Sequence, residues 1–161
     1  MIEFRPMFRV MLLITLPLAA LSCCAAEQIP KAAAEQNRSA DEAAIRAQIA
    51  ANQAATNKRD FAGVAATYAP DGDLMRLAGP RVSGRDAIRR AVEAALSRTP
   101  PGASSRTVDS IHFVSSDVAI IEITQRFSAG DRTQERGTFV MARGDGTWLI
   151  AAARVLPAEQ Q

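Results

Sequence analysis

The feature that most constrains how this chain folds is a run of four strand patterns in its C-terminal half. The breaks between these patterns, SSD, AGD and GDG, have the length and the residue types of hairpin connections. Consecutive strands joined by such short breaks pair antiparallel. The sequence therefore predicts a four-stranded antiparallel meander over residues 106–114, 117–128, 133–143 and 147–156.

Two helical patterns, a short strand pattern and a third helical pattern precede the meander. A capping-box pattern at Ser39 predicts the first helix, and Asp60 is expected to cap a second, short one. The segment PDG at 70–72 has turn composition, residues 73–78 follow as a strand, and Ser83 is expected to cap the third helix. The predicted class is α+β, in the order helix, helix, strand, helix and meander.

The first 26 residues have the composition of an export signal. Arginines precede an apolar run at residues 10–21, which is followed by small residues. A helix of that length rises only about 18 Å, against about 30 Å of hydrocarbon, so no membrane span is predicted. We expect a periplasmic or secreted protein. The stretch LSCC at 21–24 also resembles a lipobox, with a lipid on Cys24 or Cys23 as the alternative to plain cleavage at CAA.

The remaining chain is expected to form a single domain. Residues 27–38 contain a proline and no sustained apolar period, so they are interpreted as a linker before a domain at 39–157 and a tail at 158–161. Both cysteines lie before this domain, which excludes a disulfide or a thiolate site within it. The formal net charge is only +2 and the one basic cluster, RDAIRR, is interrupted by an acid, so no nucleic-acid partner is expected.

The element order resembles that of a known superfamily over residues 39–157. The stretches NKRDFAGVAATYAPDGDLM, GRDAIRRAV, VSSDVAIIEI and RGTFVMARGDGTWLIAAARV are similar to SnoaL-like proteins, and more narrowly to the SgcJ/EcaC group. This resemblance implies a cone-shaped, cystatin-like α+β barrel of the nuclear transport factor two-like type. The sheet would curl around the first helix, leave a pocket at the open end, and form sheet-to-sheet homodimers. Such relatives include enzymes and proteins that only bind, so the fold does not choose the function.

The chain departs from that group at the pocket. Asn52 and Thr56 stand where the group usually has tryptophans on the first helix. AARV at 152–155 replaces an aromatic-His-Asn-Thr ending and places Arg154 near the His position. No glycine-rich nucleotide loop follows a strand, and the single histidine, His112, gives no transition-metal spacing. We therefore expect no cofactor and no metal, and the oxidoreductase label common in the group has no visible basis.

The first helix predicts a partly polar cavity. Asn52 and Thr56 share the helical face of Ile45 and Ile49. Burial of an unpaired amide costs on the order of 1–3 kcal/mol, so a water, a neighbouring side chain or a ligand must satisfy Asn52. Tyr68 either adds its hydroxyl to this cavity or packs in the core with its tip in water.

Two carboxylates are candidates for acid-base chemistry. Asp73, with Asp71, forms either such a pair or a turn, and the turn is favoured because Pro-Asp-Gly is what a turn requires. Glu122 lies within an apolar strand. It acts as a base if it faces the cavity, or pairs with Arg126 or a partner subunit if it faces outward. The outward orientation is favoured because the opposite face is the continuously apolar one.

Arg154 is the remaining candidate site residue. Strand alternation places it on the same face as Trp148, which is expected to be covered by the core or by a partner subunit. There the guanidinium either holds a carboxylate or phosphate of a ligand or makes a structural ion pair at the rim. His112 is expected to point away from the apolar side and is given no role.

Three functions follow from these residues. The preferred one is an exported protein that binds a small, partly apolar molecule, which requires a pocket of a few hundred Å³. The second is a cofactor-independent isomerase, cyclase or hydrolase that uses Glu122 or Asp73, which requires a carboxylate inside the cavity. The third is a non-catalytic dimeric accessory module, with the cavity closed by side chains and with Glu122 and Arg126 exposed.

Overall fold

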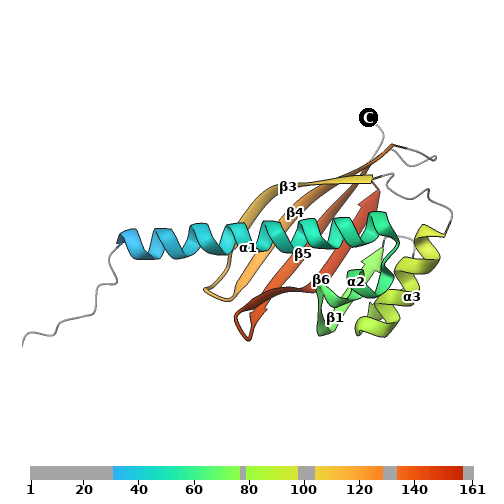
Figure 1. Ribbon diagram of the computed structural model, residues 1–161, viewed down its shortest axis with the longest axis horizontal. Helices are drawn as coiled ribbons and strands as arrows, with labels where there is room; N and C mark the ends of the chain where they lie inside the picture. Colours follow the sequence, from blue (N-terminus) through green and yellow to red (C-terminus); the bar gives the residue numbers. More distant parts are fainter. Residues whose placement is uncertain (1–30, 77–78, 98–103, 129–133, 158–161) are drawn as a thin grey trace, which may run out of the picture.

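The computed structural model describes residues 31–76, 79–97, 104–128 and 134–157, and it confirms the predicted α+β fold (Figure 1). The signal segment 1–26, with both cysteines, and the tail 158–161 lie outside these described residues. The described elements are α1 Lys31–Lys58, α2 Phe61–Ala66, β1 Tyr68–Arg76, β2 Val82–Ser83, α3 Arg85–Leu96, β3 Ser104–Phe113, β4 Val118–Phe127, β5 Gln134–Gly144 and β6 Thr147–Pro157.

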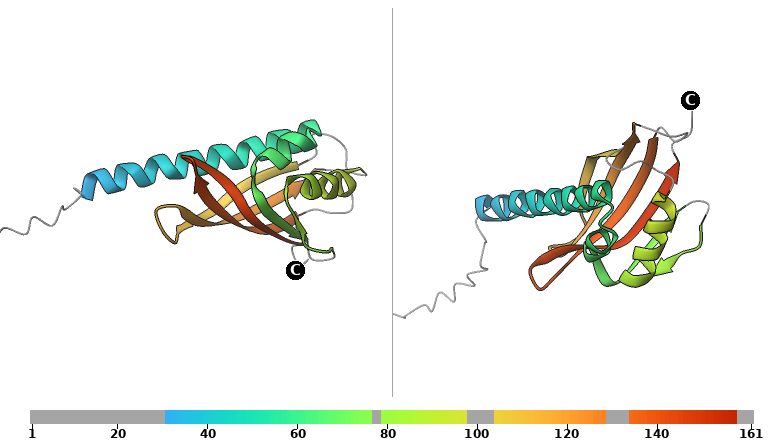
Figure 2. Two further views of the ribbon diagram at one scale, coloured as in Figure 1. Left: turned by 90° about the horizontal axis from the view of Figure 1, so that it is seen from below. Right: turned by 45° about the vertical axis from the view of Figure 1, so that its right-hand side comes forward.

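The strands form one curved sheet in the order β2-β1-β6-β5-β4-β3. The meander β3 to β6 is antiparallel, as predicted. Two further pairings have no signal in the local sequence: β1 pairs in parallel with the last strand, β6, and β2 adds a short antiparallel edge. Helix α1 crosses the concave face of the sheet, while α2 and α3 lie at its β1 end (Figures 1 and 2). The sheet thus has an inner face, turned toward the helices, and an outer face that no described helix covers.

Helix α1 begins earlier than predicted. It starts at Lys31, so most of the presumed linker 27–38 is helical and Ser39 lies inside the helix instead of capping it. The physical reason is local, since Ala, Glu and Gln favour helix even without an apolar face to bury. The N-terminal part of α1 extends beyond the sheet (Figure 1).

The segment PDG at 70–72 is not a turn but an irregularity inside β1. The pairing of β1 with β6 shifts register between Tyr68 and Asp73. A Cβ at Gly72 would stand 2.8 Å from the Ile150 carbonyl oxygen, so glycine here permits a close approach of the two strands.

The predicted N-cap residue is confirmed for α2 and is wrong for α3. Asp60 caps α2 as predicted and accepts a hydrogen bond of 2.8 Å from the Gly63 amide. Ser83 lies in β2 and does not cap α3. The N-cap is Gly84, whose φ of 82° suits glycine, and no side chain of the described residues caps the N-terminal end of α3.

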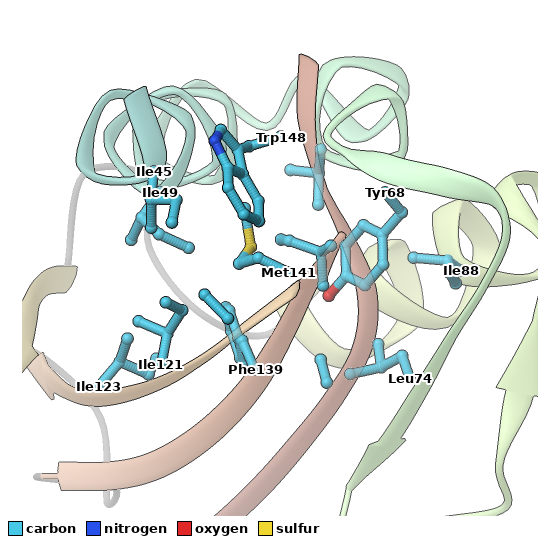
Figure 3. Packing of buried hydrophobic residues seen from close by; sticks show 14 residues of the cluster. Ile45, Ile49, Tyr68, Leu74, Ile88, Ile121, Ile123, Phe139, Met141 and Trp148 are labelled. Carbon is cyan, nitrogen blue, oxygen red and sulfur yellow. The ribbon is translucent and has the colours of Figure 1, made fainter. Parts of the chain in front are cut away.

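The core fills the space between α1 and the inner face of the sheet (Figure 3). Ile45 and Ile49 from α1 are buried against Ile121, Phe139 and other strand residues, and Ile88 joins them from α3. At the end of the sheet away from α3, the Trp148 indole N–H donates to Asp41 Oδ1 at 3.1 Å and fastens α1 to β6.

Strand β6 changes face halfway along its length, which overturns one prediction. Its pairing with β5 shifts register between Val140 and Met141, because Ala151 is an extra residue on β6. Trp148 before this bulge is buried in the core, whereas Arg154 after it lies on the outer face. The predicted shared face of Trp148 and Arg154 is therefore wrong.

Candidate functional site

A cavity lies on the inner face, between the helices and the ends of the strands, and has a volume of about 40 Å³. Three residues that the sequence singled out line it: Asn52, Thr56 and Tyr68. The other lining residues are Val64, Leu74, Arg76, Val92, Ala95, Leu96, Arg106, Gln125, Phe127, Glu135, Phe139 and Val155. The cavity is therefore apolar around most of its wall and polar at a few points.

Asn52 is satisfied by neighbouring side chains, one of the three possibilities foreseen. Its Nδ2 donates to Thr67 Oγ1 at 2.7 Å, and its Oδ1 accepts from Arg106 Nη1 at 2.5 Å. Thr56 bonds to the Asn52 carbonyl oxygen one turn back, at 2.8 Å. Hydrogen bonds within the protein thus fix the orientations of the Asn52 and Thr56 side chains.

Arg106, at the start of β3, is the cavity residue that the sequence analysis missed. Its Nη2 donates to Gln125 Oε1 at 2.9 Å, and its guanidinium carbon lies 5.6 Å from the centre of the Phe139 ring. Its Nε is buried and has no hydrogen-bond partner among the described residues. Burial lowers the pKa of Arg106 to about 10, so the group still carries its charge at neutral pH.

A second charged pair lines the same cavity. Arg76 Nη2, from the end of β1, donates to Glu135 Oε1 at 2.6 Å, and Glu135 is 4% exposed. The charged lining residues are therefore two arginines and one carboxylate. The cavity wall carries an excess of one positive charge.

Tyr68 contributes a neutral hydroxyl to this wall. Desolvation raises its pKa to about 12, and the nearby charges of Arg106 and Arg76 only partly oppose that shift. In Figure 3 the hydroxyl points toward the space between Phe139 and Leu74. At neutral pH Tyr68 is therefore a hydrogen-bond donor inside the cone.

Asp73 and Arg154 meet each other on the outer face, away from this cavity. Asp73 accepts from Arg154 Nη1 and, at 2.6 Å, from Arg81 Nη2. The Arg154 hydrogen bond is the main reason that the pKa of Asp73 lies below its usual value. A carboxylate held in this way is a poor proton acceptor near neutral pH. Asp71 is exposed two residues away.

Glu122 faces outward, as the apolar character of the opposite face indicated. It is exposed on β4 and accepts a hydrogen bond of 3.1 Å from Ser110 Oγ, and Arg126 is exposed as well. Both Glu122 and Arg154 border a larger hollow of about 540 Å³ on the outer face, together with Asp109, Ile123, Thr124, Arg136, Gly137, Thr138 and Leu156.

The described residues offer no ready metal site. Within residues 31–76, 79–97, 104–128 and 134–157, no three His, Cys, Asp or Glu side chains gather as ligands would. His112 is exposed on β3. None of the helices described for this chain is long and apolar enough to cross a membrane.

Comparison with known families gives one match. The model of the SnoaL-like domain matches residues 41–151, which is most of the described chain. No curated protein matches the sequence. The narrower resemblance to the SgcJ/EcaC group stays a prediction.

Several solved structures share the fold. A domain of unknown function with a cystatin-like fold from Nostoc punctiforme is 25% identical, with a TM-score of 0.66 over 75% of this chain and 79% of that one. A ketosteroid isomerase-like protein from Erwinia carotovora atroseptica is 21% identical, with a TM-score of 0.61 over 73% and 96%. A nuclear transport factor two-like protein with a cystatin-like fold from Novosphingobium aromaticivorans is 16% identical, with a TM-score of 0.68 over 84% and 94%. These likenesses confirm the predicted cystatin-like fold.

Proposed function

The chain belongs to the SnoaL-like domain family, and we propose that it binds a small, partly apolar molecule in the cavity of the cone, with no assigned reaction. One observation carries this proposal: the cavity has an apolar wall on which a few polar groups converge from separate elements. Asn52 comes from α1, Tyr68 from β1, Arg106 from β3 and Gln125 from β4. Ligand sites characteristically combine such walls with a few placed polar groups.

The size of the cavity limits how the ligand sits. About 40 Å³ is far below the few hundred Å³ expected for a pocket that encloses a whole ligand, although it has room for water or one functional group. The ligand therefore places only its polar head inside. Its apolar part lies against the side chains near the strand and helix ends, such as Leu96, Phe127 and Val155.

A thermal-shift screen of the purified protein tests binding directly. The panel holds small aromatic acids with their amides, alcohols and amines, together with steroids. At least one class is expected to raise the melting temperature, because a ligand that binds only the folded state stabilises it by mass action. If no class raises the melting temperature, the protein does not bind such molecules and the proposal fails.

The small cavity favours a second candidate, a non-catalytic accessory module that acts as a homodimer. The outer face of the sheet carries a band of half-buried apolar side chains that no described helix covers: Val118, Ile120, Val140, Ala142 and Leu149. Beside this band, Asp109 and Glu122 on β3 and β4 are acidic, whereas Arg136 and Arg154 on β5 and β6 are basic. A two-fold axis parallel to the strands, between two facing sheets, would bring Asp109 and Glu122 of one copy near Arg136 and Arg154 of the other.

Sedimentation measures this assembly. Ile120→Glu places a charge in the apolar band and is expected to convert dimer to monomer. Ala54→Glu adds the same charge at an exposed position of α1, the helix that packs on the inner face of the sheet, and is expected to leave the dimer intact. A wild-type chain that sediments as a monomer at all concentrations tested would overturn the dimer.

The acid-base enzyme is the least supported of the three functions. Neither of the carboxylates chosen from sequence lies in the cavity: Glu122 is exposed on the outer face, and Asp73 is held between two arginines there. The cavity carboxylate is Glu135, and Arg76 holds it at 2.6 Å.

The location of the protein is a further part of the proposal. We infer from the composition of residues 1–26 that the chain is exported to the periplasm or beyond, with Cys24 or Cys23 as the residue that would carry a lipid. Cell fractionation with intact-mass measurement tests both points. A cytoplasmic protein of full-length mass contradicts export, and a mass increment that Cys24→Ala removes identifies lipidation.

A further inference from the structure

We propose that the polar head of the ligand is a carboxylate, bound side-on by the Nε and Nη2 edge of Arg106. This inference rests on the proposed function, because it names the chemistry of the molecule that the cavity takes. It is carried by the arrangement of hydrogen bonds around one guanidinium.

The guanidinium of Arg106 is only partly used. Its Nη1 is committed to Asn52 Oδ1 on α1, which fixes the orientation of the group. On the other edge, Nε is buried with no partner among the described residues, and Nη2 donates to the amide oxygen of Gln125 at 2.9 Å. A buried N–H without a partner is destabilising, so this edge is a pair of donors that lacks part of its acceptor.

A carboxylate completes this edge better than any neutral group. Nε and Nη2 project in parallel from one side of the planar guanidinium, at the spacing of two carboxylate oxygens. The present partners of Arg106 are both neutral amide oxygens, and the one carboxylate of the cavity wall, Glu135, is bonded to Arg76. A bound acid therefore cancels the excess positive charge of the wall, which an amide, an alcohol or an amine does not.

Two neighbouring groups can accommodate the acid. Gln125 releases its hydrogen bond to Nη2 and, by turning its amide, presents an NH₂ donor to the incoming oxygen. The neutral hydroxyl of Tyr68 lines the same cavity and is a further donor. Each of the three side chains thus acts as a donor toward one anion.

Calorimetric titration with matched probes separates this inference from the proposed function. Benzoate, benzamide, benzyl alcohol and benzylamine share one ring and differ in the head group. Benzoate is expected to bind at least about 10-fold more tightly than the others, since a hydrogen bond between two charged groups is stronger than one to a neutral group. Equal binding of benzoate and benzamide overturns the carboxylate but leaves binding in place, whereas no binding by any probe overturns both.

Variants of the guanidinium locate the site. Arg106→Gln is expected to weaken benzoate binding about 10- to 100-fold and to leave benzamide binding nearly unchanged. Arg90→Gln removes the same charge from the exposed face of α3 and is expected to change neither. If the two variants weaken benzoate binding equally, the effect is one of net charge and the assignment to Arg106 is wrong.

Gln125→Glu tests the inference even if Arg106→Gln fails to fold. This variant supplies a carboxylate beside Nη2 from within the chain, so it is expected to raise the melting temperature and to abolish benzoate binding. Gln125→Met has nearly the same size, provides no oxygen, and leaves the Arg106 edge open to benzoate. Retained benzoate affinity in Gln125→Glu contradicts the side-on site.

Discussion

Arg106 on the inner face and Arg154 on the outer face make an instructive pair. Each belongs to a cluster of two arginines and one carboxylate: Arg76, Arg106 and Glu135 inside, and Arg81, Arg154 and Asp73 outside. The charge count is the same, yet the surroundings differ. The outer arginine side chains are 62% and 36% exposed, so water solvates the excess charge there.

The inner cluster has less contact with water, since the Arg76 side chain is 33% exposed, Arg106 is half-buried and Glu135 is buried. Arg106 has a buried Nε without a described partner, and its terminal nitrogens bond to amides. Water can solvate an excess positive charge at the surface. An excess positive charge in a cavity is less hydrated and needs a hydrogen-bond acceptor or a counter-charge. This contrast is why we assign a structural role to the outer cluster and a binding role to the inner one.

The largest expected loss in the free energy of unfolding comes from a substitution that breaks the outer cluster. Asp73→Asn removes a carboxylate that two arginines share, and loss of charged hydrogen bonds is expected to lower the free energy of unfolding by about 2–3 kcal/mol. Glu122→Gln, an exposed carboxylate on the same face, is expected to change it by less than about 0.5 kcal/mol. Denaturant unfolding measures both, and equal effects of the two substitutions would remove the structural role of Asp73.

A smaller loss in the free energy of unfolding is expected when the carboxylate of the inner cluster is removed. Glu135→Gln breaks the pair with Arg76, and we expect a loss of about 1–2 kcal/mol in the free energy of unfolding, since Arg76 keeps partial access to water. The same substitution leaves two cations in the cavity wall, so benzoate affinity is expected to rise several-fold. A fall in benzoate affinity would show that Glu135 supports the ligand and does not oppose it.

The pH dependence of the outer cluster follows from the lowered pKa of Asp73. The unfolded chain takes up the proton near the usual pKa of 3.8, before the folded chain does, so the cluster stabilises the fold above that pH. This contribution is lost as the pH falls through the lower pKa of the folded state. The difference in unfolding free energy between wild type and Asp73→Asn is thus expected to be constant at neutral pH and to shrink in acid. A difference independent of pH contradicts this account.

The last prediction is spectroscopic and concerns Tyr68 in the wall of the inner cavity. Tyr68 is the only tyrosine of the chain, so ultraviolet absorbance of its phenolate reports that one group. The pKa of Tyr68 is expected near 12 in the folded protein, and near 10 once denaturant exposes the ring. A titration near 10 in the folded state would mean that water reaches the cavity freely.

The sequence predicted the framework of the cavity because local patterns specify it. Asn52 and Thr56 interrupt an apolar helical face, which alone indicates a polar stretch inside the core. The meander followed from strand alternation and short breaks. Glu122 was assigned outward on the same basis, and the structure places it there.

The residues that complete the cavity were missed because they depend on pairing between distant strands. Arg76, Arg106 and Glu135 lie at strand ends, and only the sheet register brings them together. Arg154 was placed with Trp148 because a simple alternation carries no sign of the extra residue at Ala151. One inserted residue moved a predicted ligand contact to the opposite face.

The most direct test of the central claim is the proton resonance of the Arg106 Nε–H group, followed by nuclear magnetic resonance while benzoate is added. Arg106→Lys, which lacks this group, assigns the signal. We predict that benzoate shifts the Nε–H resonance strongly downfield, as a charged hydrogen bond forms, and that benzamide does not. A signal unchanged at saturating benzoate would contradict the account.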